Sequence, residues 1–147
     1  DRRYHHIRIG MNSRLDTIQA AVLLQKLEIF EEEIQLRQEV ARHYTRLLNG
    51  AGLHTTPYIA EGATSVYAQY TIRDEGRSTV QEKLKAAGIP TVVHYPIPLN
   101  RQPAVADNDV ILAVGDEVDE QVLSLPMHPY MEVSQVEAIV DKVAGVL

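Results

Sequence analysis

Apolar side chains recur every three to four positions over the first third of the chain. The recurring positions are Leu15, Ile18, Val22, Leu23, Leu27, Phe30, Ile34, Val40, Tyr44, Leu47 and Leu48. This spacing gathers apolar residues on one face of a helix. Asn12 or Ser13 is a suitable amino-terminal cap, and Asn49-Gly50 is a typical stop signal. We therefore predict a helix over residues 14–48, bent near residues 31–33 because the run is longer than most globular helices.

Shorter patterns follow residue 50 and predict a small sheet with helices around it. The predicted strands cover residues 65–72, 91–93 and 122–125, the first of them with alternating side chains. The predicted helices cover residues 77–87, 116–122 and 135–146. Ser78 and Ser134 are the expected caps of the first and last of these helices. The fold class is α/β (α+β), a single domain over residues 1–147 with a long amino-terminal helix and a small sheet flanked by helices.

The long helix has more apolar surface than so small a sheet can cover. A patch of more than a few hundred Å² is unusual on a monomer and marks a contact surface. We therefore expect the apolar face between Leu15 and Leu48 to remain partly uncovered in this chain.

Composition excludes several classes of function. The net charge of −6 disfavours a nucleic-acid partner, and the absence of cysteine excludes disulfides and thiolate metal sites. The histidines have no spacing typical of a zinc site, so no metal is expected. No apolar run reaches the ~20 residues of a membrane span and no signal peptide opens the chain, which favours a cytoplasmic protein with no membrane contact. Because the chain begins without methionine, we expect a cut within a longer polypeptide.

Two short stretches offer binding chemistry. Asn12 and Arg14 stand beside the predicted helix start, where backbone N–H groups and the helix dipole favour a phosphate. His94 and Tyr95 precede two prolines that restrict the backbone, which keeps the imidazole and the phenol in place. The plainer alternatives are a helix cap beside a surface arginine and a rigid turn with one buried aromatic.

A complete catalytic site is missing from these residues. The lysines all lie on predicted helices with charged or polar neighbours, and none looks like the desolvated amine that a Schiff base requires. No serine-hydrolase turn and no glycine-rich phosphate loop occurs either. We therefore assign no catalytic residue to this chain.

Three motifs, taken in order, resemble one enzyme family. They are Gly10-x-Asn12-x-Arg14-Leu15-Asp16-x-x-Gln19-Ala20-Ala21, His94-Tyr95-Pro96-x-Pro98-Leu99 and Leu123-Ser-Leu-Pro-Met-His-Pro129. The chain resembles the PLP-dependent nucleotide-sugar aminotransferases of the DegT/StrS group, in particular those that aminate UDP-2-acetamido-2-deoxy-3-oxo-glucuronate. The resemblance implies the aspartate-aminotransferase fold, with residues 1–30 at the end of the large PLP domain and residues 31–147 forming the small carboxy-terminal domain.

The resemblance also implies roles for the candidate residues. Asn12 would bind the phosphate of pyridoxal 5'-phosphate across a homodimer, and Arg14, His94 and Tyr95 would lie by the sugar-nucleotide pocket. L-Glutamate is the implied amino donor, a UDP-linked 3-keto sugar the acceptor, and lipopolysaccharide or surface-glycan biosynthesis the process. The family's Schiff-base lysine lies upstream and has no match here, so we expect the chain alone to be inactive. A non-catalytic module that binds nucleotide sugars or dimerises is the alternative.

Overall fold

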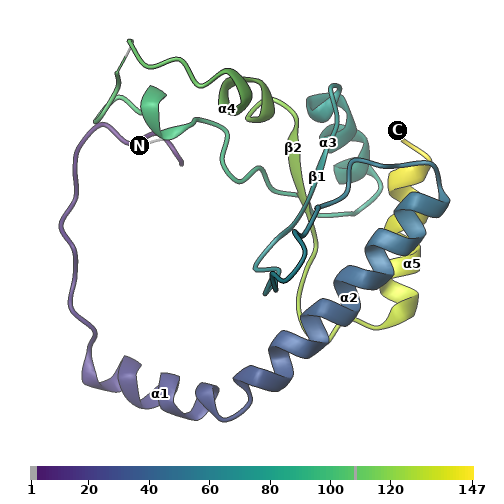
Figure 1. Ribbon diagram of the computed structural model, residues 1–147, viewed down its shortest axis with the longest axis horizontal. Coiled ribbons are helices and arrows are strands. Elements are labelled where there is room, and N and C mark those ends of the chain that lie inside the picture. The colour runs from purple at the N-terminus through teal and green to yellow at the C-terminus, as the bar shows by residue number, and fades with distance from the viewer. Residues whose placement is uncertain (1–2, 108) are drawn as a thin grey trace.

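The computed structural model describes residues 3–107 and 109–147 (Figure 1). The elements, in chain order, are α1 (Thr17–Leu27), α2 (Phe30–Gly50), β1 (Tyr70–Arg73), α3 (Arg77–Ala86), the 3-10 turn η1 (Leu99–Arg101), α4 (Ala113–Val118), β2 (Val122–Leu125) and α5 (Val133–Ala144). This arrangement of helices around a small sheet confirms the predicted fold class.

The predicted long helix is two helices. The chain turns at Glu28 and Ile29, whose N–H groups bond three residues back to Gln25 and Lys26 rather than four. The predicted bend near residues 31–33 is therefore wrong by a few positions. Those three glutamates occupy the first turn of α2 instead, where the helix dipole stabilises negative charge.

Asp16, rather than Asn12 or Ser13, caps α1. Its carboxylate accepts a hydrogen bond of 2.8 Å from the N–H of Ile18, and the helix begins at Thr17. The cap prediction was wrong because an aspartate stood closer to the first helical turn and binds its free N–H groups equally well. Asn12 consequently has no capping role.

The sheet is smaller than predicted. β1 and β2 pair in antiparallel register, from Tyr70 opposite Leu125 to Arg73 opposite Val122. The first half of the expected strand 65–72 is not extended in the sheet, since Tyr67 has a positive φ of 42°. The expected strand 91–93 contributes only a bridge between Val92 and Ser124. Of the three predicted strands, β2 alone has its predicted bounds.

The later helices lie close to their predicted ranges but start differently. Gly76, not Ser78, precedes α3, and the N–H of Gly76 donates to the carboxylate of Asp74. A reciprocal capping box between Glu132 and Gln135 starts α5, so Ser134 is not its cap. α4 begins at Ala113, three residues before the predicted helix. At α5 the side chain of Glu132 thus takes the role that was predicted for Ser134.

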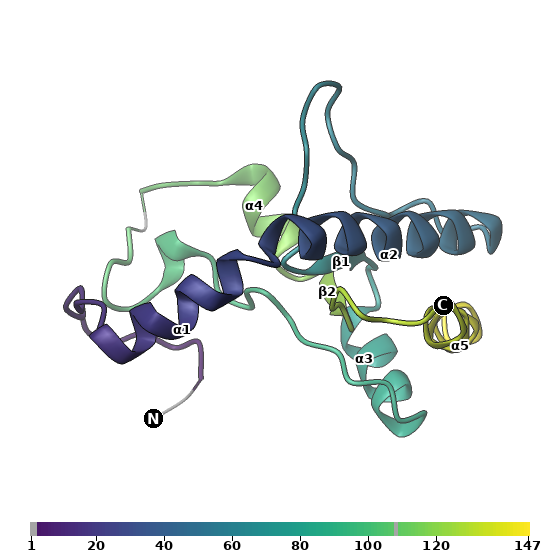
Figure 2. The same cartoon turned by 90° about the horizontal axis from the view of Figure 1, so that it is seen from below.

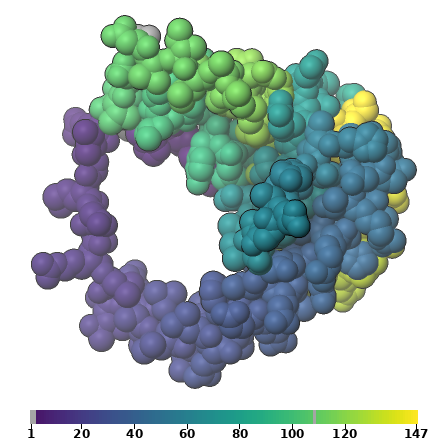
Figure 3. All heavy atoms as spheres, viewed as in Figure 1, coloured from purple at the N-terminus to yellow at the C-terminus, as the bar shows by residue number. Residues whose placement is uncertain are grey.

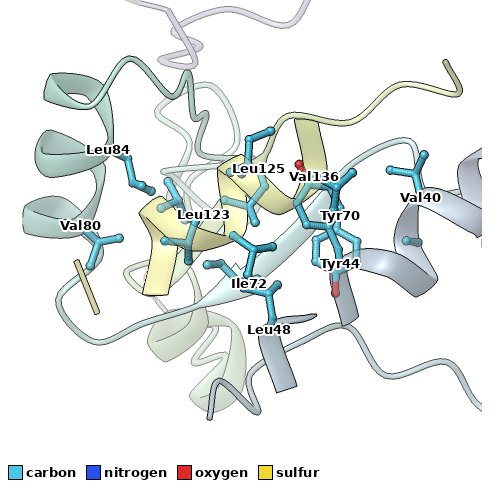
Figure 4. Close-up of a cluster of buried hydrophobic side chains, with 14 of the residues drawn as sticks. Val40, Tyr44, Leu48, Tyr70, Ile72, Val80, Leu84, Leu123, Leu125 and Val136 are labelled. Carbon is cyan, nitrogen blue, oxygen red and sulfur yellow. The ribbon is translucent and has the colours of Figure 1, made fainter. Parts of the chain in front are cut away.

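The core lies where α2, α5 and α3 pack around the two strands (Figure 4). The fully buried side chains include Tyr44, Leu48, Tyr70, Leu84, Leu123, Val136 and Val143. The rings of Tyr44 and Tyr70 stack with 4.9 Å between centroids. Both hydroxyls are satisfied, because Tyr44 donates to the carbonyl of Pro126 at 2.9 Å and Tyr70 pairs with Thr45 at 2.7 Å. The pair therefore joins α2 to the sheet without an unpaired polar group.

These two tyrosines predict an alkaline limit to stability. Burial raises the pKa of Tyr70 to about 12, and burial together with the neighbouring Tyr70 raises the pKa of Tyr44 above its ordinary value. The folded state thus holds these protons more tightly than the unfolded chain, which releases them near pH 10. Stability should be fully present below pH 10 and fall as pH rises towards 12, by about 2–3 kcal/mol for Tyr70. Urea unfolding at pH 8, 10 and 11.5 measures this, and an unchanged midpoint would contradict it.

α1 stands apart from the core. It meets α2 at an angle at the turn of residues 28–29, and the chain before it curves back to close an open ring (Figures 1 and 3). A view from below shows α1 and α2 running end to end, with the loop that follows α2 projecting away from the sheet (Figure 2). The exposed apolar side chains along α1 and its two ends are Leu15, Ile18, Val22, Leu23, Leu24, Leu27, Ile29 and Phe30. The expected uncovered apolar face is therefore confirmed for α1 and the turn after it.

In the part of the chain that the structure describes, no helix is long and apolar enough to cross a membrane.

Candidate functional site

The His94-Tyr95 corner leaves the sheet beside β2. Val92 is bridged to Ser124, and the chain then turns through His94, Tyr95 and Pro96, with a cis peptide bond between the first two. His94 is half-buried, with its Nδ1 3.0 Å from the hydroxyl oxygen of Ser124. Tyr95 is 59% exposed. The corner thus presents an imidazole held by Ser124 and an exposed phenol.

Tyr4 joins them from the other end of the chain. Its ring meets that of Tyr95 edge-on at 5.6 Å between centroids, and that of His94 at 6.5 Å. His94 and Tyr95 are themselves 5.5 Å apart. Sequence reasoning missed Tyr4, because an aromatic residue in an aperiodic segment gives no signal of the partner it will meet about ninety positions later.

A buried glutamine holds Tyr4 in this position. Gln102 is 6% exposed, and its amide nitrogen donates to the carbonyls of Tyr4 at 3.0 Å and Ile97 at 3.2 Å. Its amide oxygen accepts from the N–H of His6 at 3.0 Å, and Ala104 donates to the carbonyl of His6 at 2.9 Å. Since every polar atom of this side chain has a partner, Gln102 fastens the amino-terminal segment to the corner.

The corner borders a hollow of about 410 Å³. Its wall is formed by Tyr4, His6, His94, Tyr95, Ile97, Pro98, Leu99, Gln102, Gly115, Val118, Asp119 and Val122. The wall combines aliphatic and aromatic side chains with a few polar groups, which is the usual make-up of a small-molecule site. Asp119 in this wall and Asp116 beside it pair with Arg101, at 3.9 and 3.0 Å. The hollow can therefore receive an aromatic or sugar ring and offer it an imidazole and two phenols.

Asn12 and Arg14 lie elsewhere. Both are exposed, and neither belongs to the wall of the hollow. They lie in the segment before α1, which forms part of the open ring (Figure 1). The structure thus brings His94 and Tyr95 together but does not bring Asn12 or Arg14 to them within one chain.

The lysines are placed as the sequence predicted. Lys26, Lys83, Lys85 and Lys142 all lie on helices, and none lines the hollow. Lys83 is engaged with the carbonyl of Val146 at 3.2 Å. Within residues 3–107 and 109–147 there is also no group of three or more histidine or carboxylate side chains that could hold a metal ion. These residues can bind and orient a ligand, but the described chain offers no amine placed for covalent chemistry.

Comparison with known proteins gives the decisive observation. Residues 1–144 match the DegT/DnrJ/EryC1/StrS aminotransferase family. The chain belongs to this family. Its members are PLP-dependent sugar aminotransferases, so the predicted family and cofactor class are confirmed.

Individual relatives agree with this membership. The chain is 62% identical over 95% of its length to the UDP-2-acetamido-2-deoxy-3-oxo-D-glucuronate aminotransferase of Pseudomonas aeruginosa, and it is 31% identical to a dTDP-3-amino-3,6-dideoxy-alpha-D-galactopyranose transaminase of Aneurinibacillus thermoaerophilus. It covers 38% and 39% of these two proteins. The chain therefore spans about two-fifths of the length of the relatives it matches.

Solved structures show the same fold. S. venezuelae DesV superimposes with a TM-score of 0.84 at 34% identity, over 98% of this chain and 40% of that one. A DegT DnrJ EryC1 StrS aminotransferase from Brucella abortus gives a TM-score of 0.79 at 40% identity, over 99% of this chain and 39% of that one. The open ring and the exposed α1 therefore belong to a chain that matches only about two-fifths of each of these aminotransferases.

Proposed function

We propose that this chain is the carboxy-terminal part of a PLP-dependent aminotransferase that transfers an amino group from L-glutamate to a UDP-linked 3-keto sugar. The observation that carries the proposal is the 62% identity, over 95% of the chain, to the Pseudomonas aeruginosa enzyme whose name specifies such a substrate. The product would serve lipopolysaccharide or surface-glycan biosynthesis. The cytoplasmic location stays a prediction from the sequence.

The proposed domain division follows the break between the helices. Residues 1–30 would belong to the large PLP domain and residues 31–147 to the small domain. Two features support this division: the helical line breaks at residues 28–29, and α1 adds no buried side chain to the core formed by α2 and the later elements. The apolar face of α1 would then be covered by the large domain and by the second subunit of a homodimer.

The residues of this chain would act as binding groups. Asn12 would donate its amide to the PLP phosphate of the partner subunit, and Arg14, His94 and Tyr95 would contact the sugar nucleotide. Asn12 and Arg14 are exposed and do not line the hollow of their own chain, which supports action across a subunit boundary. PLP supplies the electron sink for amino transfer when bound. The exposed amide of Asn12 fits a phosphate oxygen, whereas the lysine that would hold the cofactor covalently has no counterpart among the described residues.

The alternative is a non-catalytic module that binds nucleotide sugars or dimerises. The observation that favours it is the absence of any lysine from the wall of the hollow. The two functions differ in whether residues upstream of this chain supply the Schiff-base lysine. The experiment therefore requires the full-length protein.

We expect the purified full-length protein to be yellow and to lose its colour when L-glutamate is added. It should then aminate a UDP-linked 3-keto sugar, while the 147-residue chain with added PLP shows no turnover. Absorbance spectra and product analysis by mass spectrometry measure both. A full-length protein that binds no PLP would overturn the enzymatic proposal in favour of the binding module. Turnover by the isolated chain would overturn the proposal that upstream residues supply the catalytic lysine.

A further inference from the structure

Ser124 occupies the middle of β2, where three segments meet. It pairs with Thr71 across the sheet and is bridged to Val92 on its other side. Its N–H donates to the carbonyl of Val92 at 2.8 Å, and its carbonyl accepts from the N–H of Val92 at 3.2 Å. The residue is 4% exposed and lies between the buried Leu123 and Leu125. Ser124 is therefore held by backbone hydrogen bonds to Val92 on one edge and lies opposite Thr71 on the other.

The hydroxyl of Ser124 has two partners in this apolar setting. The Oγ atom lies 2.9 Å from Oγ1 of Thr71 and 3.0 Å from Nδ1 of His94. A serine hydroxyl donates one proton and accepts others, so it can accept from Thr71 while it donates to His94. A buried hydroxyl without partners would be costly, which favours keeping both contacts.

This arrangement determines which nitrogen of His94 is free. Because Nδ1 is turned towards β2, Nε2 is the nitrogen left for a ligand, and the His94 ring borders the hollow. When Nδ1 accepts a hydrogen bond, the neutral ring carries its proton on Nε2 and presents a donor. A donor is the group that a phosphate or sugar oxygen requires.

We propose that Ser124 is a positioning residue for the nucleotide-sugar site: its hydroxyl, oriented by Thr71, fixes the imidazole of His94 so that Nε2–H faces the substrate. The inference rests on the proposed function for the identity of the ligand. The contact between Ser124 and His94 is independent of that identity. Ser124 acts through His94 and does not itself touch the ligand.

The test uses the full-length protein with isotope-labelled histidine and UDP-N-acetylglucosamine as a stable probe. Ser124→Ala should move the ¹⁵N signal of His94 Nδ1 towards that of a nitrogen accepting no hydrogen bond. It should also weaken the probe about three- to tenfold, as expected for one lost neutral hydrogen bond. Thr71→Val should shift both quantities in the same direction, because it removes the hydroxyl that orients Ser124.

Two variants separate positioning from a general structural effect. Thr71→Ser keeps the hydroxyl and should recover most of the affinity lost in Thr71→Val. Ser134→Ala, on the exposed face of α5, should change neither the nitrogen signal nor the binding. Equal losses in Thr71→Ser and Thr71→Val, or an unmoved Nδ1 signal in Ser124→Ala, would overturn the inference. A wild-type protein that binds no UDP-sugar would overturn the proposed function instead, and the nitrogen signal would still decide the contact.

Discussion

Replacing Asn12 by alanine in the full-length enzyme is expected to lower its affinity for PLP by roughly ten- to hundredfold. The variant removes one hydrogen bond to a charged phosphate, worth about 1.5–3 kcal/mol. Because Asp16 rather than Asn12 caps α1, the unfolding temperature of the cofactor-free protein should stay unchanged. Titration of the cofactor-free protein with PLP, followed by absorbance, measures the effect.

Arg14→Ala supplies the matching contrast. The long side chain of Arg14 would contact the negative groups of the sugar nucleotide. The variant should therefore keep PLP and bind the UDP-sugar more weakly. Asn49→Ala is the control for Asn12, since Asn49 is also an exposed asparagine and lies in the last turn of α2. If Asn12→Ala and Arg14→Ala lose thermal stability alone, both proposed roles are wrong.

The second large effect concerns the core. Tyr44→Ala should lower the free energy of unfolding by about 3–5 kcal/mol, because it removes a fully buried ring and leaves a cavity. It also removes the ring that stacks on Tyr70 and the bond to the carbonyl of Pro126. Urea unfolding monitored by circular dichroism measures this loss.

Tyr44→Phe separates the ring from the hydroxyl. This variant keeps the stack and leaves the carbonyl of Pro126 without its donor, so it should cost about 1–3 kcal/mol. Equal losses in the two variants would show that the ring contributes little and would contradict the assignment of Tyr44 to the centre of the core.

The sequence predicted the helices better than the strands. Apolar periodicity over residues 14–48 correctly predicted that the residues of α1 and α2 are helical, because a helical face is a local property of the chain. It could not find the break, which depends on hydrogen bonds at Glu28 and Ile29. The strand predicted over residues 65–72 was too long for a related reason. Alternation predicts an extended chain, whereas a strand also requires a partner, and β2 pairs with residues 70–73 of this stretch.

The candidate site likewise contains residues that a local pattern can identify and residues that it cannot. His94 and Tyr95 were identifiable because adjacent prolines mark a fixed corner in the sequence itself. Tyr4, Gln102 and Ser124 belong to the same neighbourhood through contacts between residues 30 to 98 positions apart, which no local pattern records. The family motif did include Ser124, but nothing in the motif indicates that its hydroxyl faces an imidazole.

The contact between Tyr4 and the His94-Tyr95 corner is of a different kind from the contacts that hold the core. Gln102 and Ala104 bind Tyr4 and His6 through a few hydrogen bonds, and the ring of Tyr4 meets those of His94 and Tyr95 edge-on at the border of the hollow. Tyr4 and His6 contribute no side chain to the buried core, whereas Tyr44 and Tyr70 are fully buried in it. The wall of the hollow is therefore set by hydrogen bonds and aromatic edges, and the core by buried apolar packing.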